Sequence, residues 1–438
     1  MSAESSCEAE AVTARAMKDR HPPLPHGEWR NGWPVVATSV LGVALSVVHF
    51  YSLGVFLEPI QREFGWTRAQ ITGGFAIYSI LTTVGSVVVG TFVDRVGPRR
   101  VALVGAILYS AGLASLATAD GNIWGWWMRW AFLAAGGSCL TATVWSTAIG
   151  AAFSRHRGLA IAIALSGTAI ASGVYPLTAG LMIEAFGWRM AYVGLASFGL
   201  LIVLPVLFLF FRIHRADVAG DPTETIVPLS GVSFPEGVRS ANYRRLLIAT
   251  FLFTLAITAL HIHFVPILMG SGWTTQEAAG MAIMIGISMV VGRVSAGVLI
   301  DRFNPLMIAI GAFMLPIFAS GTLILLPTYP ALAIVVAILL GLSSGSEVDV
   351  VGYLATRFFG LKSFGRLFGI ITGGWALASS IGPVAGSFSY DAFGSYEVMV
   401  WSTLAMFVLA LIPILRLRRL PALDYYRATS STSDTNRA

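Results

Sequence analysis

The stretch GTFVDRVGPRR, from Gly90 to Arg100, follows a long apolar run and reveals the plan of the whole chain. Part of it returns as GVLIDR, from Gly297 to Arg302. The offset is constant, because 297 − 90, 301 − 94 and 302 − 95 all equal 207. A shared register is much harder to obtain by chance than one shared tripeptide. The chain is therefore predicted to contain two copies of one half.

The same offset relates other parts of the chain. It connects the Gly-Trp-Thr tripeptides that begin at Gly65 and Gly272, because 272 − 65 is also 207. In the second part of each copy it carries Gly158, Gly167, Ala169, Ala171, Ser172, Pro176 and Gly187 onto Gly365, Gly374, Ala376, Ala378, Ser379, Pro383 and Gly394. Parallel repeats in a hydrophobic chain are typical of one group of membrane transporters, in which the substrate binds between the halves.

The composition excludes an ordinary soluble domain. Of 438 residues, 56% are hydrophobic and 11% are charged, whereas soluble domains carry about 25% charged residues. The mean hydropathy is +0.76. Apolar stretches recur at the length needed to cross about 30 Å of hydrocarbon. We expect an all-α integral membrane protein with twelve transmembrane helices, at 33–58, 71–92, 101–119, 123–152, 158–183, 190–212, 245–269, 276–300, 306–327, 331–355, 366–388 and 397–416.

Polar segments divide these helices into two predicted six-helix bundles, related by pseudo-symmetry. The expected order is a tail over 1–32, a bundle over 33–212, a linker over 213–244, a bundle over 245–416 and a tail over 417–438. The residues before Trp33 lack the apolar core of a signal peptide, so the first span is expected to be retained. Cys7 and Cys139 have no spacing typical of a disulfide or a metal site, and we assign them no role.

The distribution of cations predicts the orientation. Lys and Arg are enriched in cytoplasmic loops of membrane proteins. If both termini are cytoplasmic, the inner segments hold 23 of the 28 cations and the outer loops hold only Arg62, Arg68 and Arg189. The remaining two, Arg129 and Arg293, fall inside spans. We expect a multi-pass protein of the cytoplasmic (inner) membrane, whose net charge of +6 follows from topology and needs no nucleic-acid partner.

Small residues and prolines within the spans have structural interpretations. Most of the glycines predict close helix contacts, because small residues let helices pack in lipid. Pro176 and Pro383 occupy equivalent positions in the fifth and eleventh spans, where a proline bends a helix. The pair is either a set of bends on which the halves rock or a feature inherited with the repeat.

The charged motif also has two interpretations. As a solvated loop it would only add positive charge to the cytoplasmic side. As a conformational latch, its aspartate would meet cations or a helix N-terminus in one conformation and release them in another. A glycine one turn earlier would let a neighbouring helix pack close. The repetition favours the latch, with Gly90, Asp94, Arg95, Arg99, Arg100, Gly297, Asp301 and Arg302 as its residues.

The signature loop and the twelve spans together resemble the major facilitator superfamily. Four further stretches resemble its monocarboxylate porter and oxalate/formate antiporter branch, in the bacterial form. They are YSLGVFLEPI from Tyr51 with FGW from Phe64, RGLA from Arg157, GWR from Gly187, and GSEVD from Gly345. The resemblance implies the major facilitator fold and transport of small carboxylates by alternating access.

Arg293 lies deep in the eighth span, about 10 Å from its cytoplasmic end at 1.5 Å per residue. Charged residues inside a membrane are costly and mark functional sites. A guanidinium that faces a cavity would bind a carboxylate through two parallel hydrogen bonds, and the resemblance implies a substrate-binding arginine in this span. The alternative is a partner for an acidic side chain.

Three other charged residues are predicted to take part in coupling. Arg129 lies among tryptophans near the outer surface, where it could simply snorkel, yet with the glycines at 136 and 137 it resembles a fourth-span motif associated with coupling. Glu347 and Asp349 are two positions apart in the tenth span, so only one is expected to face the cavity. That carboxyl group could carry a proton, or it could pair with an arginine of a cytoplasmic loop.

Three side chains are further candidates for substrate binding. His261 and His263 in the seventh span could bond the substrate or carry protons, and either could equally be a satisfied core histidine. Tyr51 stands where the branch's animal members have a lysine, and Met289 stands where they have an aspartate. Both departures put proton coupling by that pair in doubt, although Tyr51 can still donate a hydrogen bond to a carboxylate.

These features predict a secondary transporter of a small organic anion, without cofactor or metal and as a monomer. No motif for a nucleophile, phosphate loop or cofactor appears, so an enzyme is not expected. The resemblance to oxalate/formate antiporters implies a second cation in the eleventh span, which helps to hold a divalent substrate. The span from Leu367 to Phe388 has no cation here, so the expected substrate is a monoanion, such as a monocarboxylate. Electroneutral proton symport is the expected mode. Anion antiport, export of drugs or neutral metabolites, and a membrane sensor are the alternatives.

Overall fold

The computed structural model describes residues 28–153, 156–211, 231–360 and 362–417. Cys7, most of both expected tails (1–27 and 418–438) and most of the expected linker lie outside the described residues, whereas 28–32 of the first expected tail belong to α2. The helices are α2 (Glu28–Ser46), α3 (Val48–Phe64), α4 (Arg68–Val96), α5 (Pro98–Leu116), α6 (Ile123–Ser138), α7 (Ala142–Ala152), α8 (Arg157–Leu165), α9 (Gly167–Phe198), η1 (Gly199–Val203), α10 (Leu204–Phe210), α11 (Phe234–Arg239), α12 (Ala241–Gly270), α13 (Thr275–Arg302), α14 (Pro305–Ile324), η2 (Pro330–Leu332), α15 (Ala333–Phe359), α16 (Phe364–Phe393) and α17 (Glu397–Leu415).

The prediction of twelve spans is confirmed. Eleven helical segments are long and apolar enough to cross a membrane, and one of them, Arg157–Phe210, has 54 residues. That segment is two spans, because Gly187 breaks the helix with φ 80° and ψ 163°, a conformation that favours glycine. The first span joins α2 to α3, and the fourth joins α6 to α7.

The internal repeat is visible in the local structure. Thr67 and Thr274, again 207 positions apart (274 − 67), each cap a helix N-terminus and form a capping box with the residue three positions on. The glycines two residues earlier, Gly65 and Gly272, both have positive φ, at 68° and 92°. The two halves therefore begin their second span in the same way.

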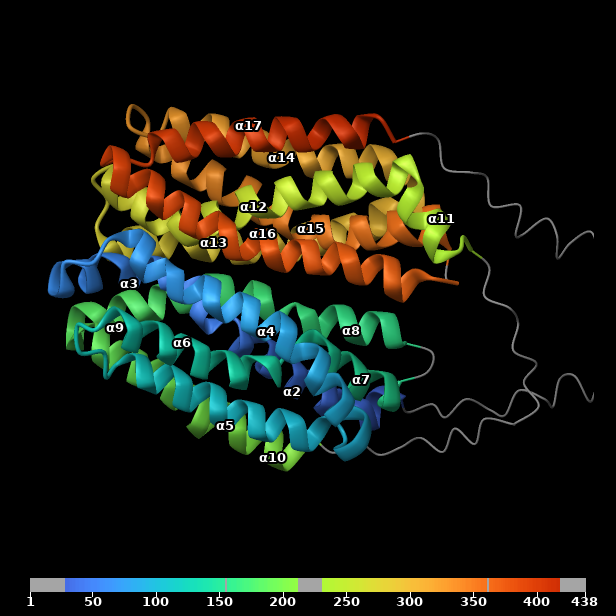
Figure 1. Cartoon of the computed structure of the whole chain (residues 1–438), viewed down its shortest axis with the longest axis horizontal. Coiled ribbons are helices and arrows are strands. Elements are labelled where there is room, and N and C mark those ends of the chain that lie inside the picture. The colour runs from blue at the N-terminus through green and yellow to red at the C-terminus, as the bar shows by residue number, and fades with distance from the viewer. Residues whose placement is uncertain (1–27, 154–155, 212–230, 361, 418–438) are drawn as a thin grey trace, which may run out of the picture.

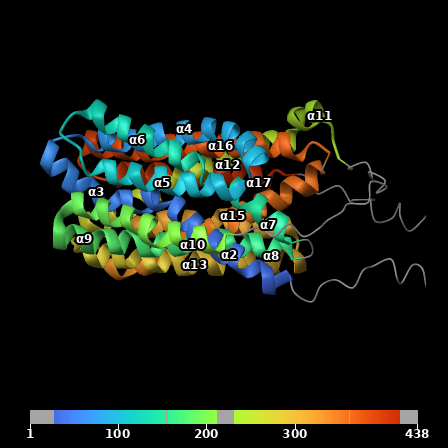
Figure 2. The same cartoon turned by 90° about the horizontal axis from the view of Figure 1, so that it is seen from below.

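The helices form two bundles that lie side by side (Figure 1). Helices α2 to α10 make one bundle, and α11 to α17 make the other. The main contacts between the bundles are α3 with α12, α4 with α16, and α9 with α13 (Figure 2). We call the end with Phe211 and Phe234 the linker end, and the end with the turns at Gly65, Gly272 and Gly394 the hairpin end.

Contacts between the bundles run from the hairpin end to the middle of the molecule. At the hairpin end, Thr72 of α4 lies 3.0 Å from Ser387 of α16, oxygen to oxygen. Near the middle, Thr168 Oγ1 of α9 lies 4.0 Å from Met289 Sδ of α13. Small residues permit these approaches, since a Cβ on Gly286 would overlap the backbone of α9. The described conformation is therefore closed at the hairpin end.

Candidate functional site

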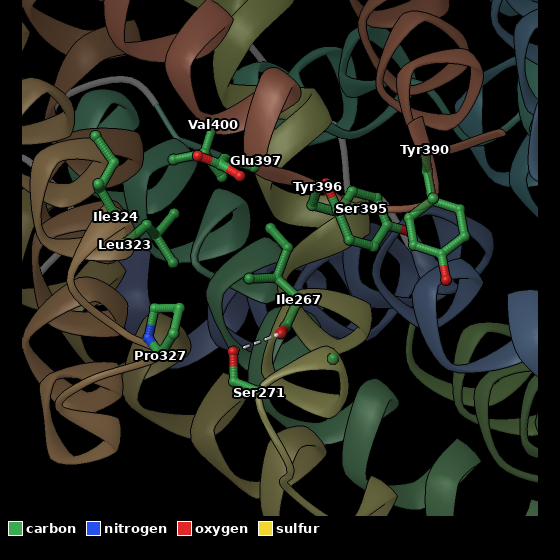
Figure 3. A pocket seen from close by; sticks show the side chains of 12 residues that line it. Ile267, Ser271, Leu323, Ile324, Pro327, Tyr390, Ser395, Tyr396, Glu397 and Val400 are labelled. Carbon is green, nitrogen blue, oxygen red and sulfur yellow. Dashed lines mark hydrogen bonds between the residues drawn. The ribbon is translucent and has the colours of Figure 1, made fainter. Parts of the chain in front are cut away.

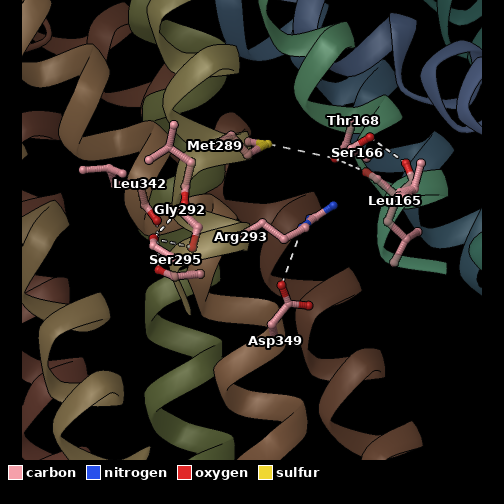
Figure 4. A network of polar contacts seen from close by, with 12 residues as sticks. Leu165, Ser166, Thr168, Met289, Gly292, Arg293, Ser295, Leu342 and Asp349 are labelled. Atoms are coloured by element: carbon pink, nitrogen blue, oxygen red, sulfur yellow. Dashed lines mark hydrogen bonds and ion pairs between the residues drawn. The ribbon is translucent and has the colours of Figure 1, made fainter. Parts of the chain in front are cut away.

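Arg293 and Asp349 are brought together by the packing of α13 against α15. The two helices run in the same direction and keep one register, because 341 − 285, 345 − 289 and 349 − 293 all equal 56. A Cβ on Gly345 would overlap the carbonyl oxygen of Met289. Glycine is required for this approach, and one turn further on Asp349 faces Arg293 (Figure 4).

The guanidinium of Arg293 is only partly paired. Its Nε lies 3.6 Å from Asp349 Oδ2, and its Nε and Nη1 are buried without a hydrogen-bond partner among the described residues. The side chains of Arg293 and Asp349 are 15% and 38% exposed, so solvent reaches the pair. Figure 4 shows the guanidinium pointing away from its own bundle, towards Leu165 and Thr168 of the other. Unused donors in a planar fork can bind a carboxylate.

Tyr51 and His261 meet at the interface between the bundles. The Tyr51 ring of α3 lies edge-on to the His261 ring of α12, with centroids 6.0 Å apart. His261 Nε2 lies 2.8 Å from Ser344 Oγ of α15. Both rings line a narrow cavity that Pro176 of α9 also borders. Three of the predicted site residues, Tyr51, His261 and Arg293, thus come from helices that meet at or beside the interface.

The two acids of the tenth span differ in their surroundings. Asp349 is partly exposed and faces Arg293. Glu347 is buried at 5% exposure, and its Oε1 has no hydrogen-bond partner within the described chain. Burying a polar group without a hydrogen bond is costly. The structure thus gives the two predicted coupling acids distinct environments.

His263 occupies a place apart from Arg293. It is fully buried, and its Nδ1 lies 3.1 Å from the Tyr396 hydroxyl. Its Nε2 lies 3.0 Å from the Pro383 carbonyl oxygen. Both ring nitrogens are therefore occupied at the hairpin end. The alternative of a satisfied histidine describes this geometry, and a role in substrate binding finds no support in it.

Arg129 bonds residues of its own bundle near the hairpin end. Its Nε donates to Thr118 Oγ1 at 3.1 Å and its Nη2 to the Thr118 carbonyl at 2.9 Å. Asp120 lies 3.9 Å away. The second contact satisfies a carbonyl group just beyond the end of α5. Coupling by Arg129 stays a prediction, and the contacts alone explain a structural role.

The predicted latch residues lie at the linker end and are largely disengaged. Within the described ranges, neither Asp94 nor Asp301 forms an ion pair, and both are exposed. Arg99 donates to the Phe208 carbonyl of α10 at 2.7 Å. The expectation of a close helix contact at the motif glycines is wrong for this conformation, because a Cβ on Gly90 or Gly297 would meet open space.

Sequence reasoning missed a polar cluster at the hairpin end. Arg68 was counted only as a loop cation, yet it is buried and bonds the Tyr396 hydroxyl across the interface. Asp391 accepts hydrogen bonds from the Arg68 and Ala69 amides at 2.9 and 2.8 Å. One signal was available, since the offset of 207 relates Asp391 to a second acid, Glu184.

Within the described ranges, no group of three or more His, Cys, Asp or Glu residues could hold a metal ion. The site is instead a cation, a carboxylate and aromatic polar groups between two helical bundles. Residues 39–346 match the family model described as Major Facilitator Superfamily. The chain belongs to this superfamily. As a major facilitator it is a multi-pass membrane transporter and not an enzyme.

The curated relatives of this facilitator support the resemblance to monocarboxylate porters. "Monocarboxylate transporter 13" of Bos taurus is 25% identical over 381 residues, which cover 85% of this chain and 85% of that protein. "Monocarboxylate transporter 12" of Homo sapiens is 24% identical over 425 residues, which cover 89% of this chain and 80% of that protein.

Solved structures share the fold. A bacterial homolog of the human lysosomal transporter Spinster, inward-facing and unoccupied, has a TM-score of 0.68 at 18% identity and covers 89% of this chain and 98% of its own. A D-xylose-proton symporter has a TM-score of 0.69 at 15% identity with the same coverage. The predicted all-α fold of two six-helix bundles is confirmed.

Proposed function

We propose that this facilitator moves a small organic anion, a monocarboxylate, together with a proton by alternating access. The observation that carries the proposal is the state of Arg293. Its guanidinium points across the interface with Nε and Nη1 unbonded among the described residues. A carboxylate is the ligand whose two oxygens match that planar fork.

Charge balance supports a monoanion. Arg293 is partly offset by Asp349 at 3.6 Å, and α16 carries no cation between Leu367 and Phe388. A carboxylate that displaces Asp349 from the guanidinium would leave the aspartate to take up a proton or to lie in solvent. Where the aspartate takes up the proton, one anion and one proton are bound in one cycle. Glu347, buried and unpaired, is the second proposed proton carrier.

Tyr51 and His261 are proposed to contact the substrate on the side away from its carboxylate. Their rings stand edge to face beside the interface, and aromatic groups with a polar tip suit an organic acid with an apolar body. The names of the curated relatives agree with this class of cargo. We also propose a cytoplasmic (inner) membrane location, cytoplasmic termini at the linker end, and a monomer, on the basis of the cation distribution.

Counterflow in proteoliposomes tests the proposal. Vesicles loaded with one unlabelled acid at a time are diluted into labelled monocarboxylate, and accumulation reports exchange through the protein. We expect accumulation with short monocarboxylates and little with dicarboxylates. Accumulation driven only by neutral or cationic compounds would contradict the proposal and favour a drug or metabolite exporter. Net uptake without internal anion separates symport from antiport.

A further inference from the structure

The cluster at the hairpin end that sequence reasoning missed is built from both bundles. From the first bundle come Arg68 and Thr72 at the start of α4. From the second come His263 of α12, Asp391 of α16 and Tyr396 just before α17. We call these five residues the hairpin gate.

Arg68 is the centre of the hairpin gate. Its Cζ lies 3.6 Å from the centroid of the Tyr390 ring, so the guanidinium is stacked on an aromatic face. Its Nε donates to Gln61 Oε1 at 3.2 Å, and its Nη1 donates to the Tyr396 hydroxyl. An arginine with this set of partners from both bundles holds them together as long as the end is closed.

Asp391 makes a second bridge between the bundles. The first amides of a helix have no partner within the helix and carry partial positive charge. Asp391 Oδ1 and Oδ2 accept from the first two of α4, at 2.9 Å from Arg68 N and 2.8 Å from Ala69 N. If the bundles parted, these hydrogen bonds would break and only water would remain to bond the two amides and the carboxylate.

The hydrogen bonds of the gate determine the protonation of His263. A guanidinium only donates, so the Tyr396 oxygen accepts from Arg68 and its single hydrogen goes to His263 Nδ1. The Pro383 carbonyl only accepts, so His263 Nε2 carries the hydrogen. The imidazole in the closed gate is therefore neutral. A proton on Nδ1 would remove the acceptor for Tyr396.

The surroundings of His263 also oppose a positive charge. The charged groups near it are Arg68 of α4, which bonds the same Tyr396 hydroxyl, and Asp391 of α16. Tyr396 and the hydroxyl of Ser387, 3.3 Å from Nε2, complete its polar contacts, and Met399 of α17 brings no charge. Asp391 is already engaged by two amides of α4. An imidazolium would thus be poorly compensated while the gate is closed.

Two hollows border Tyr390 at the hairpin gate. One of about 520 Å³ in the second bundle is lined by Tyr390, Tyr396 and Glu397 (Figure 3). A smaller one of about 230 Å³ is lined by Arg68, Tyr390 and Trp273. Arg68 and Tyr396 thus each border a hollow, and the hydrogen bond between them joins the two bundles there.

We propose that the hairpin gate is a proton-sensitive closure: it holds the hairpin end shut through Arg68, Tyr396 and neutral His263, and protonation of His263 opens it. Water reaches the ring once the bundles part, and a solvated imidazole takes up a proton near pH 6.5. Opening thus takes up one proton, and acid on the hairpin side favours the open state. The inference concerns the conformational change and does not depend on the cargo.

Distance measurement between two spin labels tests the proposal. Labels at Asp120→Cys and Tyr329→Cys, one in each bundle at the hairpin end, are attached in a background with Cys7→Ser and Cys139→Ser. For the protein without further changes we expect one short distance at pH 8 and a growing longer one as the pH falls. The open-to-closed ratio should rise by up to roughly tenfold per pH unit below about pH 6.

Three gate variants and one control separate the gate from general effects. Arg68→Gln should raise the open-to-closed ratio at pH 8 by roughly 10- to 100-fold, as expected for losing hydrogen bonds to a charged group. Arg62→Gln is the matched control, since Arg62 is exposed and pairs with Glu58 in its own helix. Tyr396→Phe removes the hydroxyl group that bonds both Arg68 and His263. It serves as the test variant if Arg68→Gln does not fold. His263→Gln should abolish the response to pH.

Two results would overturn the proposal. One is that the distribution of spin-label distances at pH 8 in both Arg68→Gln and Tyr396→Phe stays as short as in the parent protein. The other is a His263→Gln variant that opens with acid as the parent does. The measurement uses no substrate, so an error in the proposed cargo would leave its outcome unchanged.

Discussion

At Arg293, a guanidinium with five N–H donors meets a single carboxylate at 3.6 Å, so most of its bonding capacity is unused. Leaving a charged group underbonded inside a membrane is costly. Such a group persists where a ligand completes its bonds during the working cycle.

Arg293→Ala is predicted to abolish monocarboxylate uptake, and Arg293→Lys to reduce it at least roughly tenfold, because lysine keeps the charge without the planar fork. The assay is uptake by proteoliposomes with equal amounts of folded protein, judged by size-exclusion chromatography. Arg62→Ala, far from the site and exposed, should transport normally. Uptake by the alanine variant at parental affinity would remove Arg293 from the site.

Asp349→Asn is predicted to lower the KM for a monocarboxylate. The aspartate competes with the substrate for the guanidinium, and a pair whose nearest atoms are 3.6 Å apart, without a hydrogen bond, is a weak one that contributes about 0.2–1 kcal/mol. Its loss should tighten binding by up to about fivefold. Uptake against substrate concentration measures it. An unchanged KM would mean that the substrate does not displace Asp349.

Helices α13 and α15 supply the geometry on which the pair depends. The register of 56 positions (345 − 289) is kept by glycines at which the two backbones nearly touch. Elsewhere in the chain, glycines of α16 such as Gly365 face open space. The cost of replacing a helical glycine in this protein thus depends on what lies opposite it.

Gly345→Ala is predicted to destabilise the protein by about 1–3 kcal/mol, because the added methyl group overlaps the Met289 carbonyl and forces the helices apart. It should also weaken uptake, since Asp349 shifts away from Arg293. Gly365→Ala on α16 is the matched control and should be neutral. Thermal unfolding in detergent gives the comparison, and equal melting temperatures for the two variants would refute the packing argument.

The whole molecule is closed at the hairpin end, with Arg293 on the linker side of the Thr168–Met289 contact. Alternating access requires the opposite closure in another state. Asp94 and Asp301, exposed and without ion pairs among the described residues, are available to close the linker end. The predicted latch and the hairpin gate would then act in different states.

Electroneutral symport is predicted for the transport cycle. One monoanion moved with one proton transfers no net charge, whereas each uncompensated charge would feel about 2.3 kcal/mol per 100 mV. Uptake should therefore follow an imposed pH gradient and ignore an imposed potential. The measurement is proteoliposome uptake with each gradient applied separately. Transport that follows voltage alone would exclude the mechanism.

Hydropathy and the repeat of 207 positions (297 − 90) were enough to predict twelve spans in two bundles. Hydropathy depends on residues that are neighbours in the sequence, and the repeat on residues at a fixed spacing. Both can therefore be read from the sequence. Arg293 could be singled out in the same way, because a charge in an apolar run is visible without any partner.

Only the tertiary structure decided which groups meet. Asp349 faces Arg293 because a glycine lets two helices approach one turn earlier, and Glu347 is buried because it points to another face of the same helix. His263 bonds Tyr396, which in turn bonds Arg68, at sequence separations of 133 and 328. Such contacts depend on how the bundles dock, and docking is a sum over many weak contacts that no single stretch of sequence records.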